Sequence, residues 1–194
     1  MDLALSEEQD LLVTSFASLL ADSSDSESVR EAELSDTPGF DPKLWSTLTE
    51  TGAVLMAVAE EQGGWGASFL DLTLVAEQIG KASASAPVIE TQVAARLLAS
   101  VGTPPALEAL GSALEGSSIV TVALHGPSNG VLGLVPAGAI ADQIVALDGD
   151  RLLLVPVSDA SRTSVKNLAD APLADVTIGS DTVEIAAGPD AVAA

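Results

Sequence analysis

The apolar residues at the start of the chain recur at the three- and four-residue spacing of an amphipathic helix. Ser6 and Gln9 have the Ser-x-x-Gln form of a capping box, whose side chains satisfy two free backbone amides at a helix start. The apolar face of this helix consists of Leu5, Leu12, Phe16, Leu19 and Leu20. The pattern therefore predicts a first helix that begins directly after Ser6.

Four more helices are predicted before residue 117. Asp41 can cap the first of them, Pro42 suits its first position, and Gly52 suits the residue past its end. The next helix follows Ser68, and we expect it to stop at Gly80 because glycine is common just beyond a helix end. The other two are predicted over residues 91–101 and 103–115.

The stretch from Asp22 to Asp36 is acidic and rich in serine. We interpret it as a solvated loop between the first two helices, and a regulatory phosphorylation site is the alternative. At the other end, the residues from Gly188 to Ala194 have little to bury, so we expect them to fray.

After Ser117 the pattern changes to short β-branched runs bounded by turn residues. The Asp148-Gly149 and Asn129-Gly130 pairs are typical of tight hairpin turns. The predicted strands are residues 119–124, 143–147, 151–157, 173–178 and 182–185. The fold class is therefore α+β, with an all-helical domain at residues 1–116 followed by a small, mainly antiparallel β-domain at residues 117–194.

Composition narrows the possible function classes. The chain has 194 residues, of which 47% are hydrophobic and 18% are charged, so it is not a disordered protein. Its net charge of −21 disfavours binding to nucleic acid and to anionic membranes, since both need a basic surface. The absence of cysteine excludes disulfides and thiolate chemistry.

Targeting signals are not expected. The first residues, Met1 to Glu8, contain no apolar core of a signal peptide. The longest uncharged apolar run, residues 131–141, is too short to span a bilayer and is broken by Gly133 and Pro136. We therefore expect a cytoplasmic protein without membrane partners.

Few side chains are equipped for catalysis or metal binding. His125 is the single histidine, and a lone histidine in an apolar stretch is more often a hydrogen-bonded structural residue than a catalyst. The Asp148-Gly149-Asp150 segment lacks the glutamate that completes a calcium loop, so we expect no metal site. No phosphate-binding glycine motif occurs. The residue chemistry by itself names no activity.

One segment is informative as a sequence motif, although its side chains suggest no particular chemistry. Residues 58–68, with the sequence Val-Ala-Glu-Glu-Gln-Gly-Gly-Trp-Gly-Ala-Ser, resemble the Val-Pro-Glu-Glu-x-Gly-Gly-x-Gly segment of the acyl-CoA dehydrogenase family. Residues 77–82 resemble the Glu-Glu-Leu-Gly-Arg-Ala helix end of the same family, and residues 44–52 resemble its Trp-x-x-Leu-x-Glu-x-Gly motif. Residues 5–9 resemble the start of its first helix. These four matches stand in the family's order over about the first hundred residues.

The resemblance implies an N-terminal helical domain, a middle β-domain and FAD as cofactor. The family's flavin-contacting Thr-Glu-Pro and Trp-Ile-Thr segments correspond to residues 123–130 and 133–136, where those residues are lost. Ala59 likewise replaces the family's proline. The residues placed at the cofactor by this correspondence are Ala123, His125, Ser128, Val135 and Pro136. Such departures are typical of the divergent, bacterial, often heteromeric branch of the family.

The family continues into a C-terminal four-helix bundle that carries the catalytic base, much of the acyl pocket and the oligomer interface. This sequence stops where that bundle begins, so we expect no catalytic residue within it. Its seven Lys and Arg residues are few for holding the phosphates of FAD or of an acyl-CoA. We expect an exposed apolar surface where the bundle would dock.

Two hypotheses follow, and a chance match of an unrelated acidic α+β domain is the third. In the first, the chain is part of a flavin-dependent enzyme that dehydrogenates an acyl-CoA thioester of a fatty acid or a steroid side chain at its α,β positions. In the second, the chain is a non-catalytic, dehydrogenase-like scaffold that packs against an active homologue. Both predict a homo- or hetero-oligomer of dehydrogenase subunits.

Overall fold

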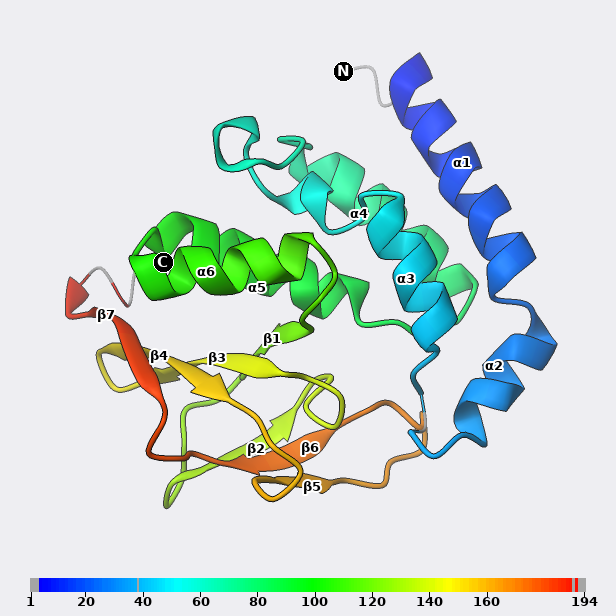
Figure 1. Cartoon of the computed structure of the whole chain (residues 1–194). Helices are drawn as coiled ribbons and strands as arrows, with labels where there is room; N and C mark the ends of the chain where they lie inside the picture. The colour runs from blue at the N-terminus through cyan, green and yellow to red at the C-terminus, as the bar shows by residue number, and fades with distance from the viewer. Residues whose placement is uncertain (1–3, 38, 190, 192–194) are drawn as a thin grey trace.

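The computed structural model describes residues 4–37, 39–189 and 191, and it arranges them as a helical part followed by two small sheets (Figure 1). The α-helices are α1 (Glu7–Ser23), α2 (Ser26–Glu33), α3 (Pro42–Glu50), α4 (Phe69–Lys81), α5 (Val88–Val101) and α6 (Pro104–Leu114). Two 3-10 turns, η1 (Leu55–Ala57) and η2 (Glu60–Gln62), lie between α3 and α4.

The strands follow in two sheets. The first has the order β1-β3-β4-β7 and the second the order β2-β6-β5. Their bounds are β1 (Val120–Val122), β2 (Val131–Val135), β3 (Gln143–Asp148), β4 (Arg151–Pro156), β5 (Arg162–Ser164), β6 (Ala174–Thr177) and β7 (Val183–Ala187). β1 and β3 are parallel, and the other paired strands are antiparallel. The expected α+β class is confirmed.

Several helix signals in the sequence are confirmed by the structure. Ser6 and Gln9 form the predicted capping box, and Asp41 accepts hydrogen bonds from the amides of Lys43 and Leu44 at the start of α3. Gly52 has a φ of +78°, and a Cβ there would lie 2.2 Å from the Trp65 ring. Both the backbone conformation and the close approach of the indole therefore require glycine at this position.

Two local predictions in the helical part are wrong. The acidic stretch contains a helix, α2, because the Asp25 side chain accepts hydrogen bonds from the amides of Ser28 and Glu27, and Ala32 packs inward. The bond from Ser28 chiefly holds the pKa of Asp25 below its usual value. Gly80 does not end α4, which continues to Lys81 before Ser83 adopts a φ of +49°.

In the strand part, the structure confirms the predicted hairpin and adds two strands that were not predicted. β3 and β4 pair around Gly149, with Asp148 opposite Arg151. Asn129 and Gly130 both have positive φ between the bridged residues Ser128 and Val131, as the Asn-Gly signal predicts. β2 and β5 are strands that the sequence pattern did not indicate, and their pairing partner β6 supplies the backbone bonds that define them.

One hydrophobic cluster joins the helices to the sheets. Leu98 of α5, Val120 of β1 and Ile144 of β3 are buried members of it, and Figure 1 shows α5 and α6 lying over β1, β3 and β4. Ala191 is also buried, so the expectation that the tail has little to bury and frays is wrong at this residue. Asp190 and residues 192–194, like Met1–Leu3, lie outside the described residues. Within the described part of the chain, no helix is both long and apolar enough to cross a bilayer.

Candidate functional site

Two loops carry the residues that the family resemblance places at a cofactor, and a threonine from β1 joins them. The first loop follows β1 and contains Ala123, His125 and Ser128, and the second lies at the end of β2 and contains Val135 and Pro136. The fully buried Thr121 hydroxyl donates a hydrogen bond of 2.8 Å to the Pro136 carbonyl. The structure therefore brings the start of the first loop to the second, and we call both together the β1–β2 loop face.

The backbone of the second loop is strained. Leu134 and Ala137 have φ values of +52° and +54°, in the left-handed region that costs a residue with a side chain about 1 kcal/mol or more. The Leu134 amide donates a hydrogen bond of 2.8 Å to the Asp175 carboxylate on β6, at an irregular step in the β2–β6 register. Asp175 thus holds the chain in a conformation that leucine disfavours, and the Leu134 side chain stays 55% exposed.

The polar side chains of the first loop lie at the surface. His125 is exposed and has no hydrogen-bond partner among the described residues, so the interpretation of His125 as a hydrogen-bonded structural residue is wrong. Ser128 is also exposed, and its backbone exchanges two hydrogen bonds with Val131 across the Asn129-Gly130 turn. Both side chains are open to solvent on the β1–β2 loop face.

Three backbone positions of this face and its edge, at Ala123, Leu134 and Pro136, have no free hydrogen-bond donor for a flavin ring. A flavin needs donors near its ring oxygens and nitrogens. Pro136 has no amide hydrogen, and its carbonyl already accepts from Thr121. The amide of Ala123 donates to the Val145 carbonyl, and that of Leu134 donates to Asp175. The backbone donors at these three positions are therefore used inside the protein or missing.

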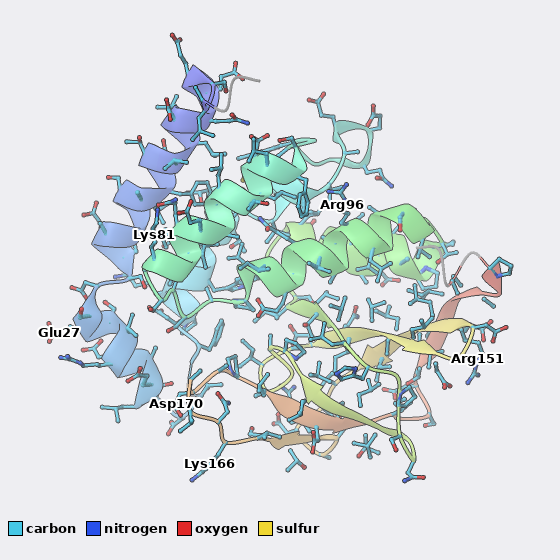
Figure 2. All side chains as sticks on the ribbon, turned by 180° about the vertical axis from the view of Figure 1, so that it is seen from behind. Glu27, Lys81, Arg96, Arg151, Lys166 and Asp170 are labelled. Carbon is cyan, nitrogen blue, oxygen red and sulfur yellow. The ribbon has the colours of Figure 1, made fainter. Side chains whose placement is uncertain are left out.

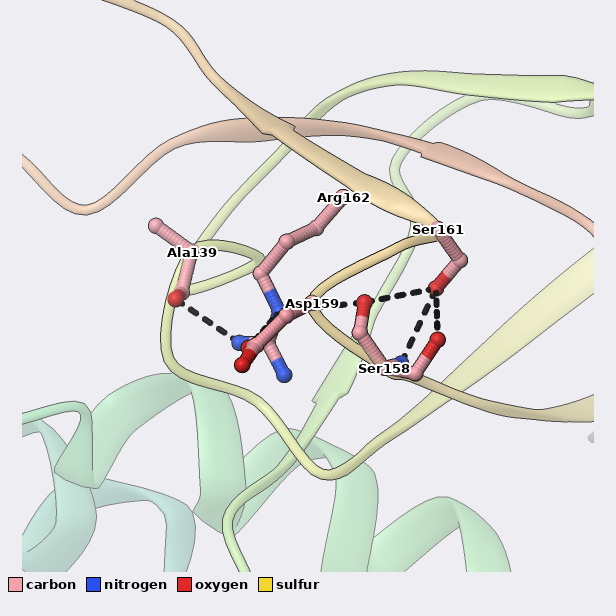
Figure 3. Close-up of polar contacts among 5 residues, drawn as sticks. All are labelled: Ala139, Ser158, Asp159, Ser161 and Arg162. Atoms are coloured by element: carbon pink, nitrogen blue, oxygen red, sulfur yellow. Dashed lines mark hydrogen bonds and ion pairs between the residues drawn. The ribbon is translucent and has the colours of Figure 1, made fainter.

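A partly buried arginine supports the second loop (Figure 3). Arg162 begins β5, its side chain is 17% exposed, and its Nη1 donates a hydrogen bond of 2.7 Å to the Ala139 carbonyl. Its Nε lies 3.4 Å from the Ser158 carbonyl and 3.6 Å from an Asp159 carboxylate oxygen. The Ala139 amide donates to the Pro172 carbonyl, so the loop is held from β1, from β5 and from the segment before β6.

A second candidate surface lies between α4 and α5, where the side chains form an open groove of about 560 Å³. We call it the α4–α5 groove. It is lined by Phe69, Leu72, Thr73, Ala76, Ile89, Gln92, Val93 and Arg96. Phe69 is 78% exposed and Val93 is 50% exposed, which is unusual for side chains of their size. Exposed apolar side chains therefore line this groove, and whether it is the surface expected at the docking site of the bundle stays a prediction.

Ionisable groups suitable for catalysis are scarce. Among the described residues, no group of three or more His, Asp and Glu side chains is placed to hold a metal ion. Burial raises the pKa of Glu90, in the first turn of α5, above its usual value. In Figure 2 the labelled cations Lys81, Arg96, Arg151 and Lys166 lie far apart over the molecule, so they form no single basic patch.

Sequence analysis missed the residues that shape both surfaces. Thr121, Asp175 and Arg162 act through contacts 15, 41 and 23 residues away, and nothing in their local sequence marks them. The α4–α5 groove carried a signal that could have been found. Phe69 and Ile89 each begin a stripe of lining residues at positions i, i+3, i+4 and i+7 of the sequence.

Comparison with known proteins agrees with the folded architecture. Residues 6–110 match the model of the acyl-CoA dehydrogenase N-terminal domain. An acyl-CoA dehydrogenase, IpdE2, from Mycolicibacterium smegmatis is 38% identical over 149 residues, which are 76% of this chain and 45% of that protein. The chain thus spans less than half the length of this curated relative.

Two solved structures share the fold across nearly the whole chain. A chain of the ChsE4–ChsE5 complex from Mycobacterium tuberculosis superposes with a TM-score of 0.86 at 24% identity, covering 99% of this chain and 60% of that one. A Tcur3481–Tcur3483 steroid ACAD variant gives a TM-score of 0.80 at 24% identity, covering 95% and 58%. At these identities the likeness shows the fold.

Proposed function

The chain belongs to the acyl-CoA dehydrogenase family, and on that premise we propose that it is a dehydrogenase-like subunit that packs against an active homologue without holding a flavin itself. One observation carries the proposal. Pro136, in the segment at residues 133–136 that corresponds to the family's flavin-contacting Trp-Ile-Thr, has neither an amide hydrogen nor a hydroxyl, and its carbonyl is bonded to Thr121. The amides of Ala123 and Leu134 are also engaged within the protein.

In this proposal the family's reaction, α,β-dehydrogenation of an acyl-CoA thioester, takes place on the partner. The residues at 1–116 form the helical domain of the subunit and those at 117–194 its β-domain. The similarity to a chain of the two-protein ChsE4–ChsE5 complex supports a hetero-oligomer, and the steroid ACAD neighbour supports a steroid-derived acyl group. The net charge of −21 supports a partner that supplies the cations for an anionic thioester.

The alternative is a flavoprotein that holds FAD through the β1–β2 loop face. The side chains of His125 and Ser128 favour it, because both are exposed and both can donate a hydrogen bond. This hypothesis predicts that Ala123, His125, Ser128, Val135 and Pro136 surround the cofactor.

A flavin titration separates the two. The purified chain is expected to show no visible flavin absorbance and no quenching of FAD fluorescence at saturating FAD. Pro136→Thr adds an amide hydrogen and a hydroxyl at residue 136 and is titrated beside the unmodified chain. Pro156→Thr, at the end of β4, makes the same change away from the loop face and is the control. Stoichiometric flavin on the unmodified chain would contradict the proposal and favour the flavoprotein.

The proposed association with an active homologue is tested by a separate measurement. A tagged copy expressed in the native host is expected to co-purify with a second acyl-CoA dehydrogenase identified by mass spectrometry, and the complex is expected to carry bound FAD. A chain that elutes alone, or with copies of itself only, would contradict the proposed heteromeric role.

A further inference from the structure

The chain has two asparagines, and the structure places their side chains in opposite environments. Asn167 lies half-buried between β5 and β6, and both ends of its amide group are hydrogen-bonded. Its nitrogen donates to the carbonyls of Val165 and Ala171, and its oxygen accepts from the amides of Ala169 and Ala171. Asn129, in the turn before β2, is exposed, and its side chain has no hydrogen-bond partner among the described residues. Its amide group is therefore open to reaction.

The peptide group that follows Asn129 is also unrestrained. In the described part of the chain, neither the Asn129 carbonyl nor the Gly130 amide forms a hydrogen bond, whereas Ser128 and Val131 on either side exchange two. A Cβ added at Gly130 would have no atom within 4 Å apart from its chain neighbours. Rotation of this peptide group therefore breaks no hydrogen bond, and glycine brings no side chain that would hinder it.

We infer that Asn129 is a site of spontaneous deamidation, in which the Gly130 amide nitrogen attacks the side-chain carbonyl carbon of Asn129. A bond forms between this nitrogen and Cγ, and the bond between Cγ and Nδ2 breaks. The side-chain nitrogen leaves as ammonia, carrying the proton that the Gly130 amide gives up. The product is a cyclic imide. One water molecule then opens the ring, so the reaction needs no oxidant, cofactor or second protein.

Water opens the imide in one of two ways. Cleavage between the ring nitrogen and Cγ leaves an ordinary aspartate at position 129. Cleavage between the ring nitrogen and the main-chain carbonyl carbon leaves isoaspartate, in which the main chain runs through the former side chain and gains one methylene group. Both products add a negative charge to the β1–β2 loop face.

The two products should differ in their effect on the fold. The tight turn depends on positive φ values of +51° at Asn129 and +78° at Gly130. Aspartate tolerates this conformation, so it should preserve the turn. The extra methylene of isoaspartate lengthens the turn and should displace Ser128 from Val131. It should also weaken the bond of 2.9 Å that the Ile178 amide donates to the Gly130 carbonyl, directly after β6.

The Asp148-Gly149 pair in the β3–β4 hairpin is expected to react more slowly. The Asp148 side chain forms an ion pair with Arg151. A carboxyl group is ionised near neutral pH, and a carboxylate is a weaker electrophile than a neutral amide. The free amide of Asn129, rather than the Asx-Gly sequence alone, therefore selects the reactive turn.

The reaction is followed by incubating the purified full chain in mildly alkaline buffer and analysing its peptides by mass spectrometry. The peptide with Asn129 should gain the mass of an amide-to-acid exchange about tenfold faster than the peptide with Asn167, which precedes a leucine. The rate should rise with pH, because the amide nitrogen attacks after losing its proton. Labelling by protein isoaspartyl methyltransferase identifies the isoaspartate.

Asn129→Gln is the matched variant, because a glutamine would have to form a larger and less favourable ring. It should abolish both the mass gain and the methyl labelling at this turn while leaving the peptide with Asn167 unchanged. Equal rates at Asn129 and Asn167 would overturn the inference. So would a mass gain that appears in chain unfolded by urea but not in the folded chain, since the turn would then protect Asn129.

The structural effect is measured by hydrogen exchange on the isoaspartyl form, separated from the unmodified chain by its added charge. Peptides that contain Val131 or Ile178 should exchange faster than in the unmodified chain, whereas Asn129→Asp, which adds the charge without the methylene, should exchange as the unmodified chain does. The Asp148–Arg151 hairpin is the internal control. Identical exchange in the isoaspartyl form and Asn129→Asp would contradict the effect on β2. Neither measurement depends on the proposed function.

Discussion

The α4–α5 groove and the β1–β2 loop face use their polar groups in opposite ways. The groove is built from two regular helices, and its exposed Arg96 pairs with none of the described residues. The loop face is built from irregular backbone, and its donors at Ala123 and Leu134 are bonded within the protein. A surface with unused donors and exposed apolar area is suited to a partner, whereas the loop face has already used its polar groups to hold its own shape.

The largest effect on stability is expected when the arginine that supports the loop face is replaced. Arg162→Met should lower the free energy of unfolding by about 1.5–3 kcal/mol, because the Ala139 carbonyl loses a charged donor. Arg151→Met removes the same charge from an exposed pair with Asp148 and should cost less than about 1 kcal/mol. Urea unfolding measures both. Equal losses would mean that Arg162 does not hold the loop.

Two fully buried threonines, one on α5 and one on β1, allow a second comparison. The Thr121 hydroxyl is bonded to Pro136, whereas the Thr91 hydroxyl on α5 has no partner in the described part of the chain. Thr121→Val should cost about 1–2 kcal/mol, since a carbonyl loses its donor, and Thr91→Val should be neutral or stabilising. The readout is the urea midpoint at constant slope. A stabilising Thr121→Val would show that its bond to the loop contributes nothing.

The strain at Leu134 gives a smaller effect with the opposite sign. Leu134→Gly relieves a φ of +52° at a half-exposed side chain, so it should be neutral or stabilise the protein by up to about 1 kcal/mol. Leu147→Gly on β3 is the control and should destabilise by about 1 kcal/mol, because glycine weakens a regular strand. Thermal unfolding followed by circular dichroism separates them. A clear loss in Leu134→Gly would mean that the strain is not relieved.

The smallest expected effect depends on pH. Burial raises the pKa of Glu90, so the folded chain binds its proton more tightly than the unfolded chain, and stability falls as pH rises through the folded pKa. Glu90→Gln does not titrate and should raise the Tm at pH 7 relative to the unmodified chain. The gain should disappear below pH 4.5, the ordinary value for this carboxyl. Glu184→Gln, at an exposed site on β7, should give no such gain, and a gain independent of pH at Glu90 would contradict the burial argument.

Much of the fold is encoded within short windows of the sequence. The Ser6–Gln9 capping box, the Asp41 cap and the Asp148-Gly149 hairpin each depend on residues a few positions apart, and the structure confirms all three. The acidic stretch from Asp22 to Asp36 shows where prediction from such local patterns fails. Its high charge indicated a loop, but one cap at Asp25 and one buried alanine are sufficient for α2.

The sequence by itself determined that helices come first and strands follow, because periodicity, caps and turn residues act over one or two turns of chain. The tertiary structure alone decided which polar groups remain free. Thr121 reaches Pro136, Asp175 reaches Leu134 and Arg162 reaches Ala139, while Arg96 reaches none of the described residues. A hydrogen bond between distant residues depends on where the backbone brings their atoms, and a single side chain carries no local signal of that distance.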